Sequence, residues 1–379
     1  MAIKKSELYS SLWSSCDELR GGMDASQYKD YILVLLFVKY VSDKYENNPN
    51  ALIEIPEGGS FKDMIALKGK KDIGEGMNKI IGKLAEANDL KGVIDMADFD
   101  DPDKLGRGKE IKDRLSNLVG IFENPALNFS QNRAEGDDLL GDAYEYLMRN
   151  FATQSGKSKG QFYTPAEVSR VMAKVIGINQ AERQDQTIYD PTCGSGSLLL
   201  KAADESPRGV TIYGQEKDSS TRALAKMNMF LHNNPTAVIE QGDTLSSPKY
   251  LNQNGTLKTF DFVVANPPFS TKAWRSGFDP ENDIYERFSD GIPPAKNGDY
   301  AFMLHLIRSM KSTGKGAIIM PHGVLFRGNA EGVIRKNLIK KGISRASLVC
   351  PPICFMAQAS RPVLSFWIKN TPLDEKEYS

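Results

Sequence analysis

The pattern of apolar positions divides the chain into two parts with different expected secondary structure. Up to about residue 155, apolar residues recur every three or four positions, as at Ile32, Leu35 and Leu36, and this spacing is typical of helices that bury one face. Strand-like alternation is scarce there, so residues 1–155 are expected to form an α-helical N-terminal domain. The polar segment 155–160 follows, and segments of this composition commonly link domains.

Beyond this segment, short runs rich in β-branched and aromatic residues alternate with helical stretches. The expected strands are 187–189, 211–213, 238–239, 260–265, 316–320, 347–350 and 363–368. The expected helices are 194–203, 221–232, 300–310 and 333–340. Strands that alternate with helices indicate a doubly wound, mostly parallel α/β sheet. We therefore expect residues 156–370 to form a Rossmann-like α/β domain, followed by a short tail at 371–379.

Composition narrows the classes of protein further. With 40% hydrophobic and 25% charged residues, the chain is typical of a globular protein with a substantial core. The longest apolar run, at 31–38, is far shorter than the ~20 residues that a membrane-spanning helix needs, and the N-terminus shows no apolar leader. We therefore expect a cytoplasmic protein with no membrane partner. Four cysteines without a C-x-x-C pair and three histidines argue against a metal site or a disulfide framework.

The formal net charge of zero hides an uneven distribution. Residues 1–150 hold 20 Lys and Arg against 27 Asp and Glu, whereas residues 151–379 hold 28 against 21. Most of the basic excess lies in 301–350, which has nine basic residues and one acidic residue, Glu331. Such asymmetry suggests that one part of the chain contacts a polyanion. A solvated helix face is the alternative interpretation.

The first motif with chemical content is 190–197, Asp-Pro-Thr-Cys-Gly-Ser-Gly-Ser, which follows an expected strand and opens an expected helix. Small residues there let a ligand approach the backbone at the edge of an α/β sheet where ligands bind. Leu199 stands where a dinucleotide-binding pattern needs its third glycine, and no phosphate-loop pattern occurs. Glu216, at the end of the next strand, could hold both hydroxyls of a ribose, and Asp190 could meet an ammonium group. Together they indicate a nucleoside that carries an amino acid, and S-adenosylmethionine (AdoMet) fits this description.

The second motif, Asn266-Pro267-Pro268-Phe269, directly follows the apolar run 260–265. Its two prolines end the strand and stiffen the turn. An exocyclic amine on an aromatic ring is a poor nucleophile because its lone pair is delocalised into the ring. The side-chain oxygen of Asn266 and the carbonyl oxygen of Pro267 could accept both amine hydrogens, which favours a pyramidal nitrogen, while Phe269 could stack on the base. The alternative is a strand-ending turn beside a core phenylalanine.

The order of these motifs resembles that of the AdoMet-dependent DNA methyltransferases that act on amino groups. More closely, the chain resembles the modification subunits of type I restriction–modification systems. The resemblance covers most of the chain. It is carried further by 12–40, by 160–165 (Gly-Gln-Phe-Tyr-Thr-Pro), by 228–232 (Asn-Met-Phe-Leu-His), by 242–245 (Gly-Asp-Thr-Leu) and by 321–326 (Pro-His-Gly-Val-Leu-Phe).

The resemblance also implies roles for particular residues. The strip 161–165 would cover the methionine end of AdoMet, although Thr164 and Pro165 could simply start a helix as N-cap and first helical residue. Asp243 would lie at the adenine amine, or could be only a turn residue. Phe355 occupies the place of the family's aromatic residue near the target base, but 356–362 departs from the family's glycine-containing turn. The residues expected to bind AdoMet are Gln161, Phe162, Tyr163, Thr164, Pro165, Asp190, Gly194, Ser195, Gly196, Ser197, Glu216 and Asp243, and those expected to act on the base are Asn266, Pro267, Pro268 and Phe269.

The resemblance implies methyl transfer from AdoMet to N6 of an adenine that is flipped out of double-stranded DNA. A specificity subunit would choose the target, and a restriction subunit would join them in the full complex. The same fold could instead methylate cytosine N4 or a glutamine amide of a protein. The chain ends at Ser379, where the family normally continues with a helical region that contacts the specificity subunit, so a truncated, non-catalytic assembly subunit is a further alternative.

Overall fold

The chain folds into two units. The computed structural model describes residues 5–20, 23–46, 48, 51–130, 144, 146–148, 150–151, 164–349 and 362–368. Met1–Lys157 and Lys226–Pro235 form one unit, and Ser158–Ala225 and Thr236–Ser379 form the other. The domain boundary expected at 155/156 lies outside the described residues and stays a prediction.

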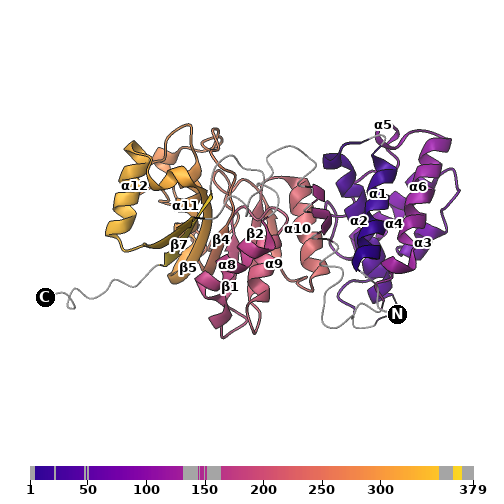
Figure 1. Cartoon of the computed structure of the whole chain (residues 1–379), viewed down its shortest axis with the longest axis horizontal. Coiled ribbons are helices and arrows are strands. Elements are labelled where there is room, and N and C mark those ends of the chain that lie inside the picture. Colours follow the sequence, from indigo (N-terminus) through magenta and orange to yellow (C-terminus); the bar gives the residue numbers. More distant parts are fainter. Residues whose placement is uncertain are drawn as a thin grey trace. The chain divides into compact units, whose positions relative to one another are not determined.

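The first unit contains helices and turns but no strand among its described residues (Figure 1). Its helices are α1 (Lys5–Leu19), α2 (Ala25–Tyr45), α3 (Phe61–Ile65), α4 (Ile73–Ala87), α5 (Pro102–Leu105) and α6 (Lys109–Phe122), followed by the 3-10 turn η1 (Pro125–Leu127). The apolar run 31–38 lies within α2 and is buried along its whole length, because α1, α3 and α6 all pack against this helix.

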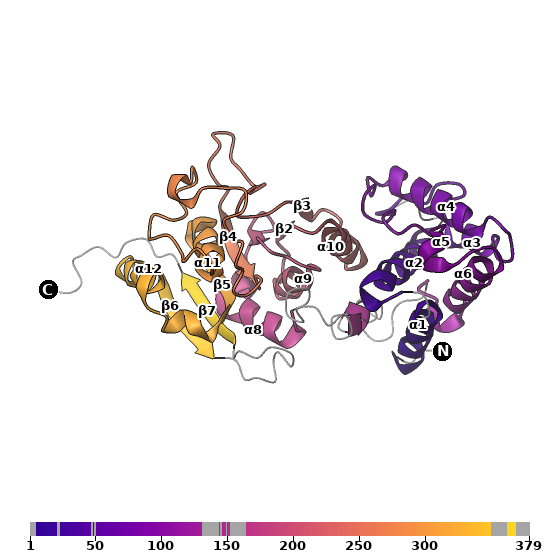
Figure 2. The ribbon, with the colours of Figure 1, turned by 90° about the horizontal axis from the view of Figure 1, so that it is seen from above.

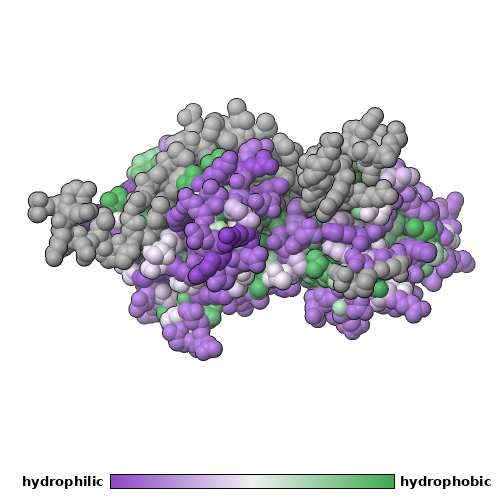
Figure 3. Space-filling model, turned by 90° about the horizontal axis from the view of Figure 1, so that it is seen from below, coloured by the Kyte–Doolittle hydropathy of each residue, from purple (hydrophilic) through white to green (hydrophobic). Residues whose placement is uncertain are grey.

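Among the described residues, no helix is both long and apolar enough to cross a membrane. On the face shown in Figure 3, hydrophobic side chains form small separate patches.

The segment 226–235 joins the first unit although it lies far along the chain. The rings of Phe37 and Phe230 meet edge to face with their centroids 6.3 Å apart. Lys44 Nζ donates a hydrogen bond to Asn233 Oδ1 at 2.8 Å. These tertiary contacts are not expected from the sequence pattern, which assigns this segment to the end of an α/β helix.

The second unit is built on a seven-stranded sheet in the order β3-β2-β1-β4-β5-β7-β6. Its strands are β1 (Thr187–Asp190), β2 (Thr211–Glu216), β3 (Val238–Gln241), β4 (Phe260–Ala265), β5 (Met310–Pro321), β6 (Ser344–Val349) and β7 (Pro362–Ile368). Neighbours among β1 to β5 pair in parallel, and β7 is antiparallel to both β5 and β6 (Figure 2). The expected Rossmann-like, mostly parallel sheet is confirmed. The helix expected at 300–310 is wrong at its end, because Met310 pairs with Phe260 and begins β5.

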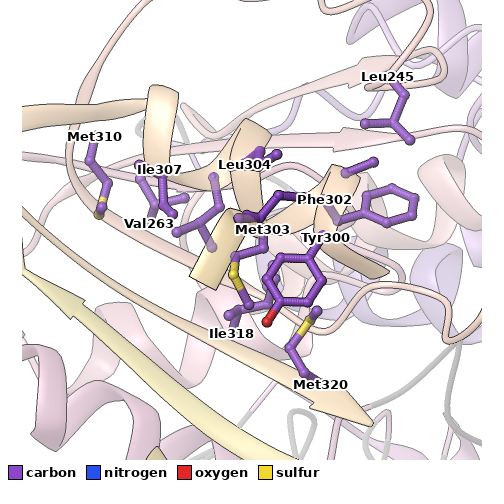
Figure 4. Close-up of a cluster of buried hydrophobic side chains, with 14 of the residues drawn as sticks. Leu245, Val263, Tyr300, Phe302, Met303, Leu304, Ile307, Met310, Ile318 and Met320 are labelled. Carbon is purple, nitrogen blue, oxygen red and sulfur yellow. The ribbon is translucent and has the colours of Figure 1, made fainter. Parts of the chain in front are cut away.

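The helices of this unit cover the sheet and bury its apolar side chains. They are α8 (Ala166–Ile176), α9 (Ser197–Asp204), the first part of α10 (Ser219–Leu231), α11 (Asp299–Arg308) and α12 (Asn329–Lys340), with the short turns η2 (Ile178–Gln180), η3 (Pro280–Asn282) and η4 (His322–Leu325). From residue 226 on, α10 belongs to the first unit. Tyr300, Met303 and Ile307 of α11 belong to one buried cluster with Ile318 and Met320 of β5 (Figure 4). Because β1 to β5 run parallel, their carboxyl ends lie at one edge of the sheet, where ligands of α/β proteins bind.

A buried arginine holds the long segment between β4 and α11. The side chain of Arg287 is 1% exposed and pairs with Asp283 at 2.6 Å, and the Asp283 side chain is 5% exposed. The same guanidinium donates hydrogen bonds to the carbonyl oxygens of Thr244 at 3.2 Å and Leu245 at 2.8 Å. Arg287 therefore connects the segment after β4 with the turn after β3.

Removal of Arg287 should destabilise the second unit strongly. In Arg287→Ala the carboxylate of Asp283 stays buried without its partner, and breaking a buried ion pair in this way costs about 3–5 kcal/mol. Arg183→Ala is the matched control, because Arg183 and Asp185 pair at the surface with side chains 72% and 71% exposed, and such pairs contribute at most ~1 kcal/mol. Urea denaturation measures the difference, and equal midpoints for the two variants would contradict the role of Arg287.

Candidate functional site

Two glycines shape the turn between β1 and α9. Gly194 has a φ of 53° and Gly196 a φ of 78°, both in the left-handed region that residues with a Cβ atom adopt at a cost. The Gly196 amide donates to the carbonyl of Cys193 at 2.8 Å. Ser195 is buried, and its hydroxyl lies 2.9 Å from that of Ser197. The turn therefore presents backbone and small side chains at the start of α9.

Glu216 ends β2 and accepts two backbone hydrogen bonds. Its Oε2 accepts from the Gly194 amide at 3.0 Å, and its Oε1 accepts from the Asp218 amide at 2.9 Å. The first bond ties the carboxylate to the glycine turn after β1. Burial raises the pKa of Glu216 above its ordinary value, so further hydrogen-bond donors from a ligand would stabilise the ionised form.

Asp190 ends β1 and is the second buried acid of the site. It is 1% exposed, and its Oδ1 accepts from the Thr192 amide at 2.8 Å. Burial, with the charge of Glu216 acting in the same direction, raises the pKa of Asp190 to about 8. A cationic group beside Asp190 would favour its ionised form, so this region selects for positive charge.

The turn after β3 brings Asp243 to the end of β2. The amide of Gly242 donates to the carbonyl of Glu216 at 2.9 Å. Asp243 Oδ1 accepts from the Leu245 amide at 2.9 Å. Its Oδ2 pairs with Lys217 at 2.8 Å, and the Asp243 side chain is 26% exposed. Asp243 is therefore anchored by its turn while part of its carboxylate faces outward.

The turn after β4 places Asn266 next to Thr164. Asn266 is 7% exposed, and its Nδ2 donates to Thr164 Oγ1 at 3.2 Å. Pro267 is also buried, whereas Pro268 and Phe269 are half-buried. The contact joins residues that are 102 positions apart in the chain. The end of β4 and the start of the second unit therefore meet at one point.

The residues that precede α8 are described in part. The interpretation of Thr164 as a helix N-cap is wrong, because α8 begins at Ala166 with Pro165 as its N-cap and has no side-chain capping bond. The Thr164 hydroxyl instead accepts the bond from Asn266. Four further residues with an expected role lie outside the described residues: Gln161, Phe162, Tyr163 and Phe355.

A buried carboxylate that the sequence motifs do not single out holds the turn after Phe269. Ser270 has a φ of 52°, and its amide donates to Asp299 Oδ1 at 2.6 Å. Asp299 is 1% exposed, and its Oδ2 pairs with Arg327 at 2.9 Å. Its sequence signal is an acid at the start of an apolar helix, which is also an ordinary helix-start feature. Asp299 fixes the backbone that carries Asn266 and Phe269.

These contacts bring most of the described site residues to one edge of the sheet. Asp190, the turn 194–197, Glu216 and Asp243 are connected through backbone hydrogen bonds at the ends of β1, β2 and β3. The turn 266–269 follows β4, which pairs with the other side of β1. Within the described residues, no group of three or more His, Cys, Asp or Glu side chains could hold a metal ion. The described residues at this edge include carboxylates, an amide and an aromatic ring.

Two family models match the chain. The model described as N-6 DNA Methylase matches residues 135–377, which is more than half of the chain. The model described as HsdM N-terminal domain matches residues 8–122. The first match includes all of the site residues described above.

The chain is also similar along nearly its whole length to methylase subunits of type I restriction enzymes. It is 27% identical to the MjaIX methylase subunit of Methanocaldococcus jannaschii, over 97% of this chain and 70% of the relative. It is 30% identical to the MpnII methylase subunit of Mycoplasma pneumoniae, over 91% of this chain and 73% of the relative. The type I methyltransferase subunit from Streptococcus thermophilus has a TM-score of 0.82 and 30% identity, with 97% of this chain and 86% of that chain covered. The chain belongs to the N-6 DNA methylase family, among the methylase subunits of type I restriction–modification systems.

Proposed function

We propose that this chain transfers a methyl group from AdoMet to N6 of a flipped-out adenine in double-stranded DNA. The observation that carries the proposal is the position of the turn 266–269 after β4, while the Glu216 region follows β2, with β1 between these strands. A cofactor region and an amine-holding turn thus share one edge of the sheet. Membership of the N-6 DNA methylase family favours adenine over cytosine N4 or a protein glutamine.

The residues at the ends of β1 to β3 fit AdoMet. A ribose needs acceptors for its two hydroxyls, and Glu216 is a largely buried carboxylate at the end of β2. The positive charges of AdoMet suit a region in which burial and the charge of Glu216 both raise the pKa of Asp190. The turn 194–197 would line the cofactor, 161–165 would cover its methionine end, and Asp243 would accept from the adenine amine. When bound, AdoMet supplies an electrophilic methyl group.

The Asn-Pro-Pro-Phe turn would hold the target amine. Asn266 Oδ1 and the Pro267 carbonyl would accept its two hydrogens, which favours a pyramidal nitrogen with an available lone pair. The bond from Nδ2 to Thr164 orients the Asn266 amide for this task. Phe269 would stack on the extruded base, since a base inside a duplex cannot reach the cofactor.

We assign residues 1–155 to a helical N-terminal domain, 156–370 to the catalytic domain and 371–379 to a tail. Two separate family matches, to 8–122 and to 135–377, support a division into two parts, and the second match begins before residue 156 and extends beyond residue 370. We also propose a specificity subunit as the partner that selects the DNA sequence, and a restriction subunit as the partner in the full complex. We also propose a cytoplasmic location.

Tritium transfer from labelled AdoMet to duplex DNA tests the proposed function. The chain is assayed alone and with its specificity subunit, and the DNA is then digested to nucleosides. Label in N6-methyladenine that depends on the specificity subunit is the expected result. Label in N4-methylcytosine or in protein glutamine would replace the proposed acceptor. No transfer by the assembled complex would contradict the proposal.

Glu216→Gln should weaken AdoMet binding, because the ribose hydroxyls lose a charged acceptor. Hydrogen bonds to a charged group contribute about 1.5–3 kcal/mol each, so the Kd should rise at least about tenfold. Glu240→Gln on the neighbouring strand β3 is the matched control and should bind normally. Calorimetry measures both, and a folded Glu216→Gln variant with parental affinity would refute the assignment.

AdoMet affinity should fall as the pH drops below about 8, the pKa of Asp190 in the free protein. A bound cation favours the ionised carboxylate, so binding below this pKa must release a proton, and affinity then falls by up to about tenfold per pH unit. Calorimetry in buffers with different ionisation enthalpies measures the released proton. Asp190→Asn should bind more weakly, with a flatter pH dependence. An unchanged slope in this variant would assign the titration to another group.

Asn266→Ala should separate catalysis from cofactor binding. Its oxygen matters most when the amine becomes pyramidal, so kcat should fall roughly a hundredfold, as is typical when one transition-state hydrogen bond is lost, while AdoMet affinity stays near parental. Asn252→Ala in an exposed hairpin is the control. Phe269→Ala should weaken binding of the extruded base because the stacking ring is lost. Phe269→Tyr should retain most activity because the ring still stacks. Parental single-turnover rates in Asn266→Ala would make the turn merely structural.

A further inference from the structure

Phe326 is a large exposed side chain near the edge of the sheet that carries Asn266. It follows β5, which runs parallel to β4, so the two strands end at the same edge. Phe326 is 67% exposed, and Leu325 beside it is 37% exposed. Isolated exposed hydrophobic residues are common on protein surfaces. The way in which this one is held is what distinguishes it.

The loop that presents Phe326 is fixed by arginine side chains. Arg335 donates to the carbonyl of Val324 at 2.9 Å and to that of Arg327 at 2.6 Å. The amides of Phe326 and Arg327 both donate to the carbonyl of Gly323, at 3.1 and 3.0 Å. A Cβ atom at Gly323 would lie 2.5 Å from Nε of Arg327, so the loop closes tightly around that arginine. The backbone is therefore held on both sides of Phe326, whose exposed ring meets the ring of His322 edge to face with the centroids 5.2 Å apart.

One buried carboxylate ties this loop to the Asn-Pro-Pro-Phe turn. Arg327 pairs with Asp299 Oδ2 at 2.9 Å, and Asp299 Oδ1 accepts from the Ser270 amide at 2.6 Å. Arg327 directly follows Phe326, and Ser270 directly follows Phe269. The Asp299 network thus fixes the backbone next to both aromatic residues.

The stretch of sequence that contains this loop is rich in basic residues. Segment 301–350 holds nine basic residues and one acid. That acid, Glu331, is 1% exposed and pairs with Arg327 at 3.0 Å, so it adds little negative charge at the surface. An exposed aromatic ring on a fixed loop, in a stretch of chain rich in basic residues, has the features of a platform on which an unstacked base can stack.

We propose that Phe326 stacks on a nucleobase of the DNA when the target adenine leaves the duplex, and so supports the opened base-pair step. This inference rests on the proposed function. Extrusion of one base exposes the faces of its neighbours, and a ring that is already held in place covers one of them at little cost in entropy. Phe269 would then stack on the extruded base, and Phe326 would stack on a base that remains in the duplex.

The test uses the chain assembled with its specificity subunit and a duplex with 2-aminopurine at the target position, which fluoresces when it unstacks. Phe326→Ala should reduce the fluorescence rise and raise the KM for DNA roughly tenfold, as the loss of one base-stacking contact predicts. AdoMet affinity should not change, and Phe326→Trp should restore both readings. Ile339→Ala is the matched control, because Ile339 is 66% exposed near the other end of α12, and it should alter neither reading.

A second duplex, in which the target adenine faces a mismatched base, isolates the opening step. Extrusion from a mismatch costs less, so the defect of Phe326→Ala should shrink on this DNA. An equal defect on both duplexes, or weaker association of the variant with the specificity subunit, would overturn the proposal. Parental behaviour of Phe326→Ala in an active complex would overturn it too. If the unmodified complex does not methylate DNA at all, the proposed function itself fails.

Discussion

The parallel pairing of β1 with strands on both sides is the constraint on which the site depends. Asp190 pairs with Gly214 of β2, and Tyr189 pairs with Val263 of β4. The chain then reaches Glu216 and Asn266 within a few residues, so both emerge at the edge where β1 ends. A register slip of one residue would turn every side chain of a strand to the other face. The apolar residues that set the register for the core therefore also set the geometry of the site.

Two buried carboxyl groups of the site ionise less readily than free ones, and a cationic ligand would stabilise their ionised forms. Burial raises the pKa of Asp190 from 3.8 to about 8, and the pKa of Glu216 is raised for the same reason. A carboxyl group whose pKa is raised by folding takes up a proton when the chain folds. Its destabilising effect is therefore absent in acid, grows as the pH rises above its unfolded value, and is complete above the folded value. The two carboxyl groups therefore lower the stability of the free protein most at high pH, where both are ionised and a cation binds best.

The sequence predicts the parts of the site that depend on local pattern. Asp190, Glu216 and Asn266 each follow a short apolar run, and parallel topology then brings strand ends together without further information. Contacts that join distant segments carry no such signal. Thr164 has the local features of a helix cap, but its hydroxyl accepts from Asn266 instead. Met310 continues a helical pattern, yet strand pairing with β4 takes precedence over it.

The two sides of the site are held by different interactions, and this difference has a consequence for catalysis. Backbone hydrogen bonds to Glu216 hold the proposed cofactor side, whereas charged side chains around Asp299 hold the proposed acceptor side. Arg287 connects the two sides, because it anchors the segment after β4 to the carbonyl of Thr244. The hydroxyl of Thr244 in turn donates to the carbonyl of Pro191, after β1, at 2.5 Å. A misplacement of reacting groups by about 1 Å can cost roughly a hundredfold in rate. A rigid connection between two independently built halves is therefore what methyl transfer at this edge requires.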